Sequence, residues 1–78
     1  MAAHVVVYSR QGCGACALTM RALERAGVDF EVVDLDANPA ALRLVKALEL
    51  SSAPVVTTGD RWWSGFRPER IRALHHEA

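Results

Sequence analysis

Residues 4–16 read HVVVYSRQGCGAC, and the predicted fold depends more on this stretch than on any other. The run from His4 to Tyr8 is rich in β-branched residues, which suits a strand buried on both faces. Residues 9–14 interrupt that run, and two cysteines three positions apart lie at its far end. A Cys-x-x-Cys pair that follows a strand and opens a helix is typical of a redox-active dithiol.

A helix is predicted over residues 13–26, and Gly27 stands where a left-handed residue would end it. The apolar positions at helical spacing are Cys16, Met20 and Leu23, flanked by Ala22 and Ala26. Residues 30–35 return to strand composition. Two strands joined by a helix generally lie parallel through a right-handed crossover, so we expect a βαβ unit.

A second helix is predicted from the Asn38-Pro39 pair, an N-cap followed by the first helical position, to about Leu50. Its apolar positions at i, i+3, i+4 and i+7 are Ala41, Leu44, Val45 and Leu48. Residues 54–57 and 61–64 flank the turn formers 58–60 and predict an antiparallel hairpin.

The hairpin is predicted to end at Gly65, and Pro68 can open a last helix. Ile71 and Leu74 would form the buried stripe of that helix. The predicted order is βαβαββα, an α/β thioredoxin fold with a four-stranded mixed sheet, three helices and helices on both faces. All 78 residues, 1–78, are expected to form a single domain because two separate cores would need about 50 residues each.

The charge balance argues against two classes of function. Nine basic and nine acidic side chains cancel, which argues against a nucleic-acid or anionic-membrane binder. Residues 1–8 lack the pattern of a secretory signal, and no apolar run approaches the ~20 residues of a membrane span. We therefore expect a cytoplasmic monomer. A disulfide between the two cysteines would close too short a ring to stabilise the fold greatly, so chemistry is its more plausible purpose.

The two cysteines are expected to play different parts. The free N–H groups and the dipole of the first helical turn would stabilise a thiolate at Cys13, so this thiol should ionise more readily than a free cysteine. Arg10 would add positive charge nearby, and the adjacent glycines leave the sulfur accessible. Cys16, one turn later, should be more buried and serve as the resolving thiol.

Two structural alternatives compete with the redox interpretation. The cysteines could be half of a zinc site, but His4 begins the first strand and His75 and His76 lie at the far end of the chain, so convergence is not indicated. They could also be two buried cysteines without chemistry. We expect no metal and no bound cofactor.

Two further segments carry weaker signals. In Ser51-Ser52-Ala53-Pro54 the proline precedes a strand and could be cis, leaving nearby backbone free to pair with an extended substrate. Trp62 and Trp63 must point to opposite faces of their strand, so one can be core and the other exposed. Whether these indoles cover the core or form a docking surface stays open at this point.

Taken together, the chain resembles the NrdH-redoxins, glutaredoxin-like proteins of the thioredoxin fold that donate electrons to class Ib ribonucleotide reductase. The resemblance covers nearly the whole chain. It rests on Cys13-Gly14-Ala15-Cys16, on Ala53-Pro54-Val55-Val56 and, most specifically, on Trp63-Ser64-Gly65-Phe66-Arg67-Pro68.

The resemblance implies a site and two protein partners. Pro54 would be cis and face the dithiol, and residues 63–68 would line the surface where thioredoxin reductase docks, with electrons drawn ultimately from NADPH. Two positions depart from the family pattern. Ala15 stands where a glutamine is common, and Glu69 follows Pro68 where aspartate is usual.

Other reductants and a non-enzymatic role remain alternatives. Glutathione-using glutaredoxins carry a Gly-Gly turn and an acidic pair after the last strand, whereas residues 65–68 offer bulk and positive charge. Glutathione or another small thiol as the reductant is one alternative. A non-catalytic module that binds a partner or a metal is the other.

Overall fold

The computed structural model describes residues 4–50 and 52–75, and its elements follow the predicted order. They are β1 (Val5–Ser9), α1 (Gly14–Arg25), β2 (Phe30–Asp34), α2 (Pro39–Ala47), β3 (Val55–Thr57), β4 (Trp62–Ser64) and α3 (Pro68–His75). Ser51 and His76, which the sequence interpretation included, lie outside the described residues. In the part of the chain that is described, no helix is long and apolar enough to span a membrane.

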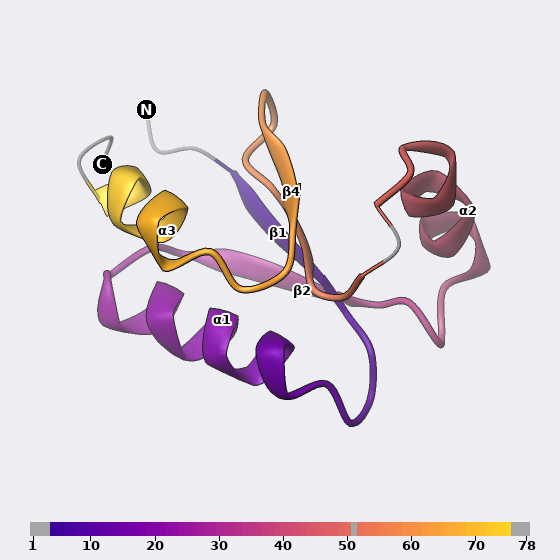
Figure 1. Cartoon of the computed structure of the whole chain (residues 1–78), viewed down its shortest axis with the longest axis horizontal. Helices are drawn as coiled ribbons and strands as arrows, with labels where there is room; N and C mark the ends of the chain where they lie inside the picture. Colours follow the sequence, from indigo (N-terminus) through magenta and orange to yellow (C-terminus); the bar gives the residue numbers. More distant parts are fainter. Residues whose placement is uncertain (1–3, 51, 76–78) are drawn as a thin grey trace.

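The four strands form one mixed sheet in the order β2-β1-β3-β4 (Figure 1). β1 pairs in parallel with β2 from Val5 opposite Phe30 onward, as the predicted βαβ unit requires. β3 is antiparallel to β1, with Val55 opposite Tyr8, and antiparallel to β4. The α/β thioredoxin fold and the hairpin predicted from sequence are therefore confirmed.

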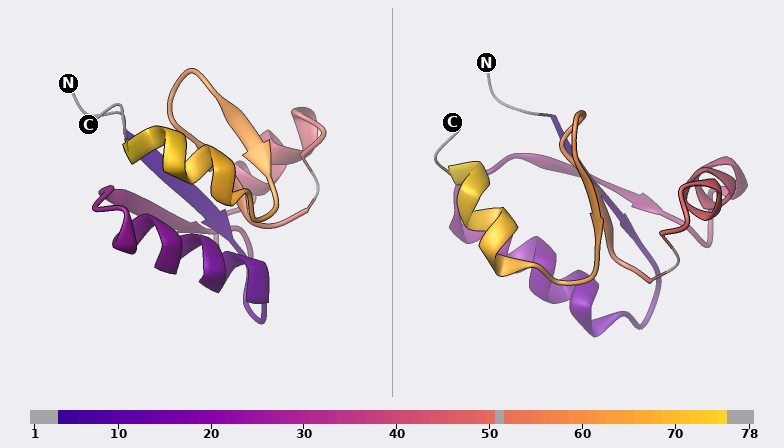
Figure 2. Two further views of the ribbon diagram at one scale, coloured as in Figure 1. Left: turned by 60° about the vertical axis from the view of Figure 1, so that its left-hand side comes forward. Right: turned by 45° about the horizontal axis from the view of Figure 1, so that its top comes forward.

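Helices cover both faces of this sheet, and each face has its own core. Figure 2 shows α1 and α3 side by side on one face, with α2 on the other. The core under α1 and α3 consists of Val5, Val7, Leu23, Val56, Trp63, Ile71 and Leu74. The core under α2 consists of Leu35, Ala41, Val45 and Val55, with Tyr8 and Trp62 packed against it.

The start of α2 and the end of α1 have the cap residues that the sequence indicates. The Asn38 side chain accepts a hydrogen bond from the Ala41 N–H at 3.0 Å, and Pro39 occupies the first helical position. Gly27 ends α1 in the left-handed conformation, with φ at 72°. The Val28 N–H bonds back to the Leu23 carbonyl at 3.0 Å, which closes a Schellman motif.

Helix α2 ends at Ala47, earlier than the predicted end near Leu50. It closes with the same motif as α1, since the Leu50 N–H bonds to the Val45 carbonyl at 3.0 Å. The left-handed residue is Glu49, with φ at 61°. Glycine or asparagine usually marks such an end, so the glutamate gave no sequence signal.

The buried faces of the helices differ from the predicted stripes at three positions. Leu44 and Leu48 are each 42% exposed, because the side of α2 that faces the sheet carries Ala41 and Val45, which are buried, and Leu42, which is partly buried. Thr19, which the apolar pattern did not include, is fully buried in α1. Its hydroxyl donates to the Ala15 carbonyl at 2.8 Å, so burial leaves no polar atom unsatisfied there.

The two tryptophans of β4 point to opposite faces, as alternation along a strand requires. Trp63 is 4% exposed and lies in the core under α1 and α3. Trp62 is half-buried on the other face and stacks on Tyr8, with ring centroids 6.0 Å apart. Both indoles therefore help to cover the sheet.

Candidate active site

The fold brings four segments together where β1 ends. The loop of residues 10–13 leaves β1 there and leads into α1. β3 begins beside the same point, because Val55 pairs with Tyr8 and with Ser64. The Leu35 N–H, just beyond β2, bonds to the Ser9 carbonyl at 2.8 Å. The predicted cysteine loop, the proline loop and the end of β4 thus lie at the same end of the sheet, where β1 and β4 end and β3 begins.

Cys13 and Cys16 form a disulfide at this edge, with their Cα atoms 5.2 Å apart. Cys13 is the N-cap residue of α1 and is half-buried, whereas Cys16 lies one turn into the helix and is 2% exposed. The expected difference in accessibility between the two sulfurs is confirmed. An incoming reagent can reach Cys13 far more readily than Cys16.

The start of α1 provides the electrostatic setting of the Cys13 sulfur. The backbone N–H of Cys16 donates to Cys13 Sγ at 3.1 Å, so a cysteine sulfur takes the place that a serine or aspartate oxygen holds in most N-caps. Helix α1, which is described along its whole length, has no acidic residue in its first turn. The positive end of the helix dipole therefore acts on this sulfur without a carboxylate in the first turn of the helix to oppose it.

Arg10 is oriented differently from the sequence-based expectation. Its guanidinium donates to Asp36 Oδ1 from Nε at 3.2 Å and from Nη2 at 3.1 Å. The Gln11 backbone N–H donates to the other oxygen of Asp36 at 3.2 Å. Arg10 is thus paired with a carboxylate, not with the cysteines, and Asp36 fastens the loop before Cys13 to the end of β2.

These hydrogen bonds also act on the carboxylate of Asp36. The Gln11 N–H, followed by the Arg10 guanidinium, lowers the pKa of Asp36 below its ordinary value of 3.8. Asp36 was not among the sequence-predicted site residues, because its partners precede it by 25 and 26 positions. Its place directly after the second strand of the βαβ unit was the one available signal.

The Ala53–Pro54 peptide bond is cis, as the sequence and the resemblance suggested. Pro54 is buried, and its carbonyl accepts a hydrogen bond from the Gly65 N–H at 2.8 Å. Gly65 has φ at 84°, a conformation that glycine adopts without steric cost. This bond joins the proline loop to the segment that follows β4.

The segment from Trp63 to Pro68 contributes unequally to the surface. Trp63 is a core residue, so its indole does not offer a docking face. Ser64 and Gly65 are half-buried, whereas Phe66 and Arg67 are exposed. The Arg67 side chain donates from Nε to the Ser64 carbonyl at 3.4 Å. Phe66 and Arg67 are therefore the most accessible residues of this segment.

The surroundings of the cysteines do not resemble a metal site. Among residues 4–50 and 52–75, no group of three or more His, Cys, Asp or Glu side chains is placed to hold a metal ion. His4 lies against Glu31, with Nε2 3.5 Å from Oε2.

Comparison with known proteins agrees with this geometry. The family model for glutaredoxin matches residues 5–63. The chain is 42% identical over 71 residues to the glutaredoxin-like protein NrdH of Escherichia coli K12, covering 91% of this chain and 88% of that protein. It is 31% identical to the NrdH protein of Lactococcus lactis strain IL1403 over 70 residues, which cover 90% of this chain and 97% of that one.

The chain also matches a solved structure of an NrdH-redoxin. The structure of E. coli NrdH-redoxin, a glutaredoxin-like protein with a thioredoxin-like activity profile, superposes with a TM-score of 0.90 at 42% identity. The match covers 92% of this chain and 95% of that one. The chain therefore belongs to the glutaredoxin family, in its NrdH-redoxin group, and is a thiol–disulfide oxidoreductase.

Proposed function

We propose that this protein reduces disulfides of class Ib ribonucleotide reductase through Cys13 and Cys16, and that thioredoxin reductase returns it to the dithiol form with electrons from NADPH. One observation carries the proposal. An accessible Cys13 caps α1 and accepts the Cys16 N–H, while Cys16 itself is buried one turn behind. We place this cycle in the cytoplasm, where thiols are kept reduced, and assign it to a monomer.

The first step forms a mixed disulfide. The Cys13 thiolate attacks one sulfur of the substrate disulfide, a Cys13–substrate S–S bond forms, and the other substrate sulfur leaves as a thiolate. The N–H groups at the start of α1 stabilise the Cys13 thiolate before the attack.

The second step releases the substrate. Cys16 loses its proton and attacks Cys13 Sγ, which is held next to it, and the second substrate sulfur leaves. The substrate has then gained two electrons and two protons, and the protein holds the Cys13–Cys16 disulfide. Burial of Cys16 protects it from unwanted substrates while leaving it in reach of Cys13.

Two observations support thioredoxin reductase as the electron source. The E. coli relative has a thioredoxin-like activity profile. Residues 65–68 present the exposed Phe66 and Arg67 where glutathione-using glutaredoxins have a Gly-Gly turn and an acidic pair. A phenyl ring and a guanidinium group do not recreate the backbone and carboxylate contacts that grip glutathione.

A coupled assay tests the proposal. NADPH oxidation is followed with thioredoxin reductase, this protein and an oxidised class Ib ribonucleotide reductase, and in parallel with glutathione and glutathione reductase. Turnover should be faster in the first system. Cys13→Ser should abolish it, because the remaining thiol, Cys16, is buried and out of reach of a protein disulfide.

Cys16→Ser provides the matched control. This variant keeps the attacking thiol, so it should stop after one step and accumulate a mixed disulfide that mass spectrometry detects. Activity retained by Cys13→Ser would refute the assignment of the nucleophile. Faster turnover with glutathione would refute the assignment of the reductase.

A further inference from the structure

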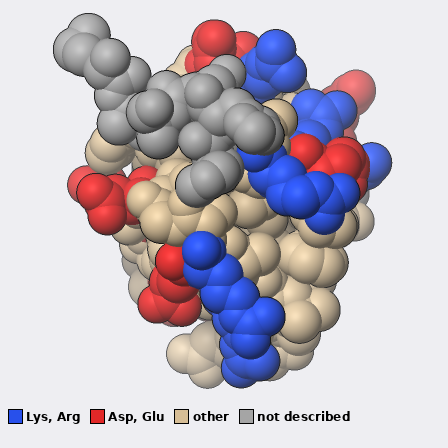
Figure 3. Space-filling model, turned by 90° about the vertical axis from the view of Figure 1, so that its left-hand side faces the viewer, with Lys and Arg blue, Asp and Glu red and all other residues tan. Residues whose placement is uncertain are grey.

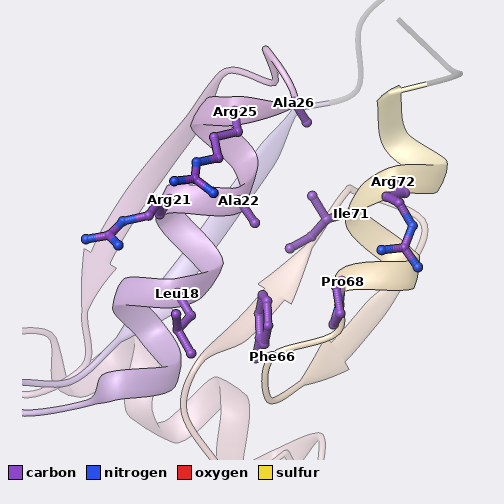
Figure 4. Close-up of a pocket in the computed structure, with 9 residues that line it drawn as sticks. All are labelled: Leu18, Arg21, Ala22, Arg25, Ala26, Phe66, Pro68, Ile71 and Arg72. Carbon is purple, nitrogen blue, oxygen red and sulfur yellow. The ribbon is translucent and has the colours of Figure 1, made fainter.

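A groove runs between α1, the helix that Cys13 caps, and α3. Its volume is about 500 Å³. The residues that line it include Leu18, Arg21, Arg25, Phe66, Ile71 and Arg72 (Figure 4). None of these is a residue to which the disulfide exchange above assigns a chemical step.

The groove has an apolar floor with two unusually accessible side chains. Leu18 is 50% exposed and Phe66 is 37% exposed, although both are large and hydrophobic. Between the helices they continue into Ala22 and Ile71 (Figure 4). Such a surface can take up one large apolar side chain of a partner.

Among the described residues that line the groove, every charged side chain is basic. Arg21 and Arg25 extend from the outer side of α1, and Arg72 from the outer side of α3, so their guanidinium groups flank the groove and do not enter it (Figure 4). Among the described residues, none of the three guanidinium groups has a hydrogen bond or an ion pair. Glu24 and Glu69 lie on the same two helices, but neither lines the groove.

Basic side chains therefore surround an uncharged surface on a protein whose net charge is zero. In Figure 3 basic groups lie above and below an uncharged area, with acidic groups beside both of them. Carboxylates are the complementary partner for unpaired guanidinium groups, and exposed charges of this kind accelerate encounter more than they strengthen binding.

We propose that this groove, which we call the arginine-rimmed groove, binds an acidic peptide segment that carries one large apolar side chain and flanks the disulfide of a protein substrate. The inference rests on the proposed reduction of protein disulfides and names the substrate feature that is recognised.

The helix sets the spacing that the peptide must have. At about 1.5 Å per residue, Arg21 and Arg25 lie ~12 Å and ~18 Å along α1 from Cys13. An extended peptide covers these spans with roughly four and six residues. Acidic residues about four to six positions from the target cysteine, with the apolar residue before them, match the groove.

Synthetic peptides test this inference without any reductase. Each peptide has one cysteine disulfide-linked to thiopyridine, a leucine three positions away, and Asp or Glu at positions four to six. A matched peptide has Asn or Gln there instead. Stopped-flow absorbance of the released thiopyridone, with the pre-reduced protein, gives the rate constant for each peptide, and their ratio is the acidic preference.

The wild-type protein should reduce the acidic peptide roughly tenfold faster than the neutral one at low salt, and the preference should fall as salt is added. Arg21→Glu combined with Arg25→Glu and Arg72→Glu should abolish or invert it. The control triple variant, Arg43→Glu with Lys46→Glu and Arg61→Glu, makes the same charge change at exposed positions outside the groove and should keep most of it.

Equal rate constants for the two peptides with the wild-type protein would overturn the inference. So would an equal loss of the acidic preference in both triple variants. A dimer in sedimentation experiments that only the groove variant dissociates would also overturn it, because a second copy would then occupy the groove. Fluorescence anisotropy with serine in place of the peptide cysteine separates the two proposals. Preferential binding of the acidic peptide without reduction supports the groove and refutes the redox function, and reduction without preference does the reverse.

Discussion

Asp36 ties the loop before Cys13 to the sheet through both of its carboxylate oxygens. One oxygen accepts from the Arg10 side chain and the other from the Gln11 N–H. The lowered pKa of Asp36 means that its carboxyl group ionises more readily in the folded state than in the unfolded state. Ionisation of Asp36 therefore stabilises the fold.

Asp36→Asn should therefore lower the urea midpoint at neutral pH. For a carboxyl with a lowered folded pKa, the stabilisation is present above its ordinary value of 3.8 and is lost as the pH falls through the folded value. The difference in urea midpoint between the wild type and the variant should therefore disappear in that acid range. Urea titrations from neutral to strongly acidic pH, followed by circular dichroism, measure it.

Asp29→Asn is the matched control, since Asp29 is an exposed aspartate without a hydrogen bond or ion pair among the described residues. It should leave the urea midpoint unchanged at each pH. If the difference in urea midpoint between wild type and Asp36→Asn persists in strong acid, the charge of Asp36 is not what stabilises the loop before Cys13.

The contrast between Cys13 and Asp36 shows what sequence can predict about a site. The cysteine pair is local, because three positions place both sulfurs on one helical turn. Asp36 acts across 25 to 26 positions, and its partners are set by the parallel pairing of β1 and β2. Contacts that depend on sheet pairing leave no periodic pattern in the sequence.

At the scale of elements, α1 and α2 end with the same hydrogen-bonded motif but with different residues. Gly27 fills the left-handed position of α1, and Glu49 fills that of α2. A side chain in this conformation costs about 1 kcal/mol or more relative to glycine. A carboxylate at a helix C-terminus also opposes the dipole.

Glu49→Gly should stabilise the protein by roughly 0.5–1 kcal/mol, since it removes both costs and loses some chain entropy in return. Gly27→Ala should destabilise it by roughly 1 kcal/mol, even though the added methyl meets no atom within 4 Å, because φ alone is unfavourable. Chemical denaturation of both variants checks the pair. Destabilisation by Glu49→Gly would mean that its side chain forms contacts that outweigh the strain.

At the level of the whole molecule, the sheet divides the interior into two cores, and the leucines of the helices that cover them are buried to different depths. Leu23 of α1 is fully buried against β1 and β3, whereas Leu44 of α2 remains 42% exposed. Sequence periodicity marked both leucines as apolar helical positions. It could not tell how deeply each helix packs, because a nine-residue helix such as α2 presents only a narrow stripe to the sheet.

This leucine pair gives a direct test of that division. Leu23→Ala should cost roughly 2–5 kcal/mol, because it removes buried apolar surface and leaves a cavity. Leu44→Ala should cost under about 1 kcal/mol. Free energies of unfolding from urea titrations measure both, and similar costs for the two substitutions would contradict the assignment of Leu44 to the surface.

In the whole molecule Cys13 is accessible to reagents, whereas Cys16 is buried. Brief alkylation of the fully reduced protein with iodoacetamide at neutral pH, followed by fragmentation of the tryptic peptide 11–21, shows which cysteine has reacted. The structure predicts modification at Cys13, faster than for a free cysteine, with Cys16 left unmodified. Equal modification of both residues, or reaction first at Cys16, would contradict the central claim that α1 presents Cys13 as the attacking thiolate.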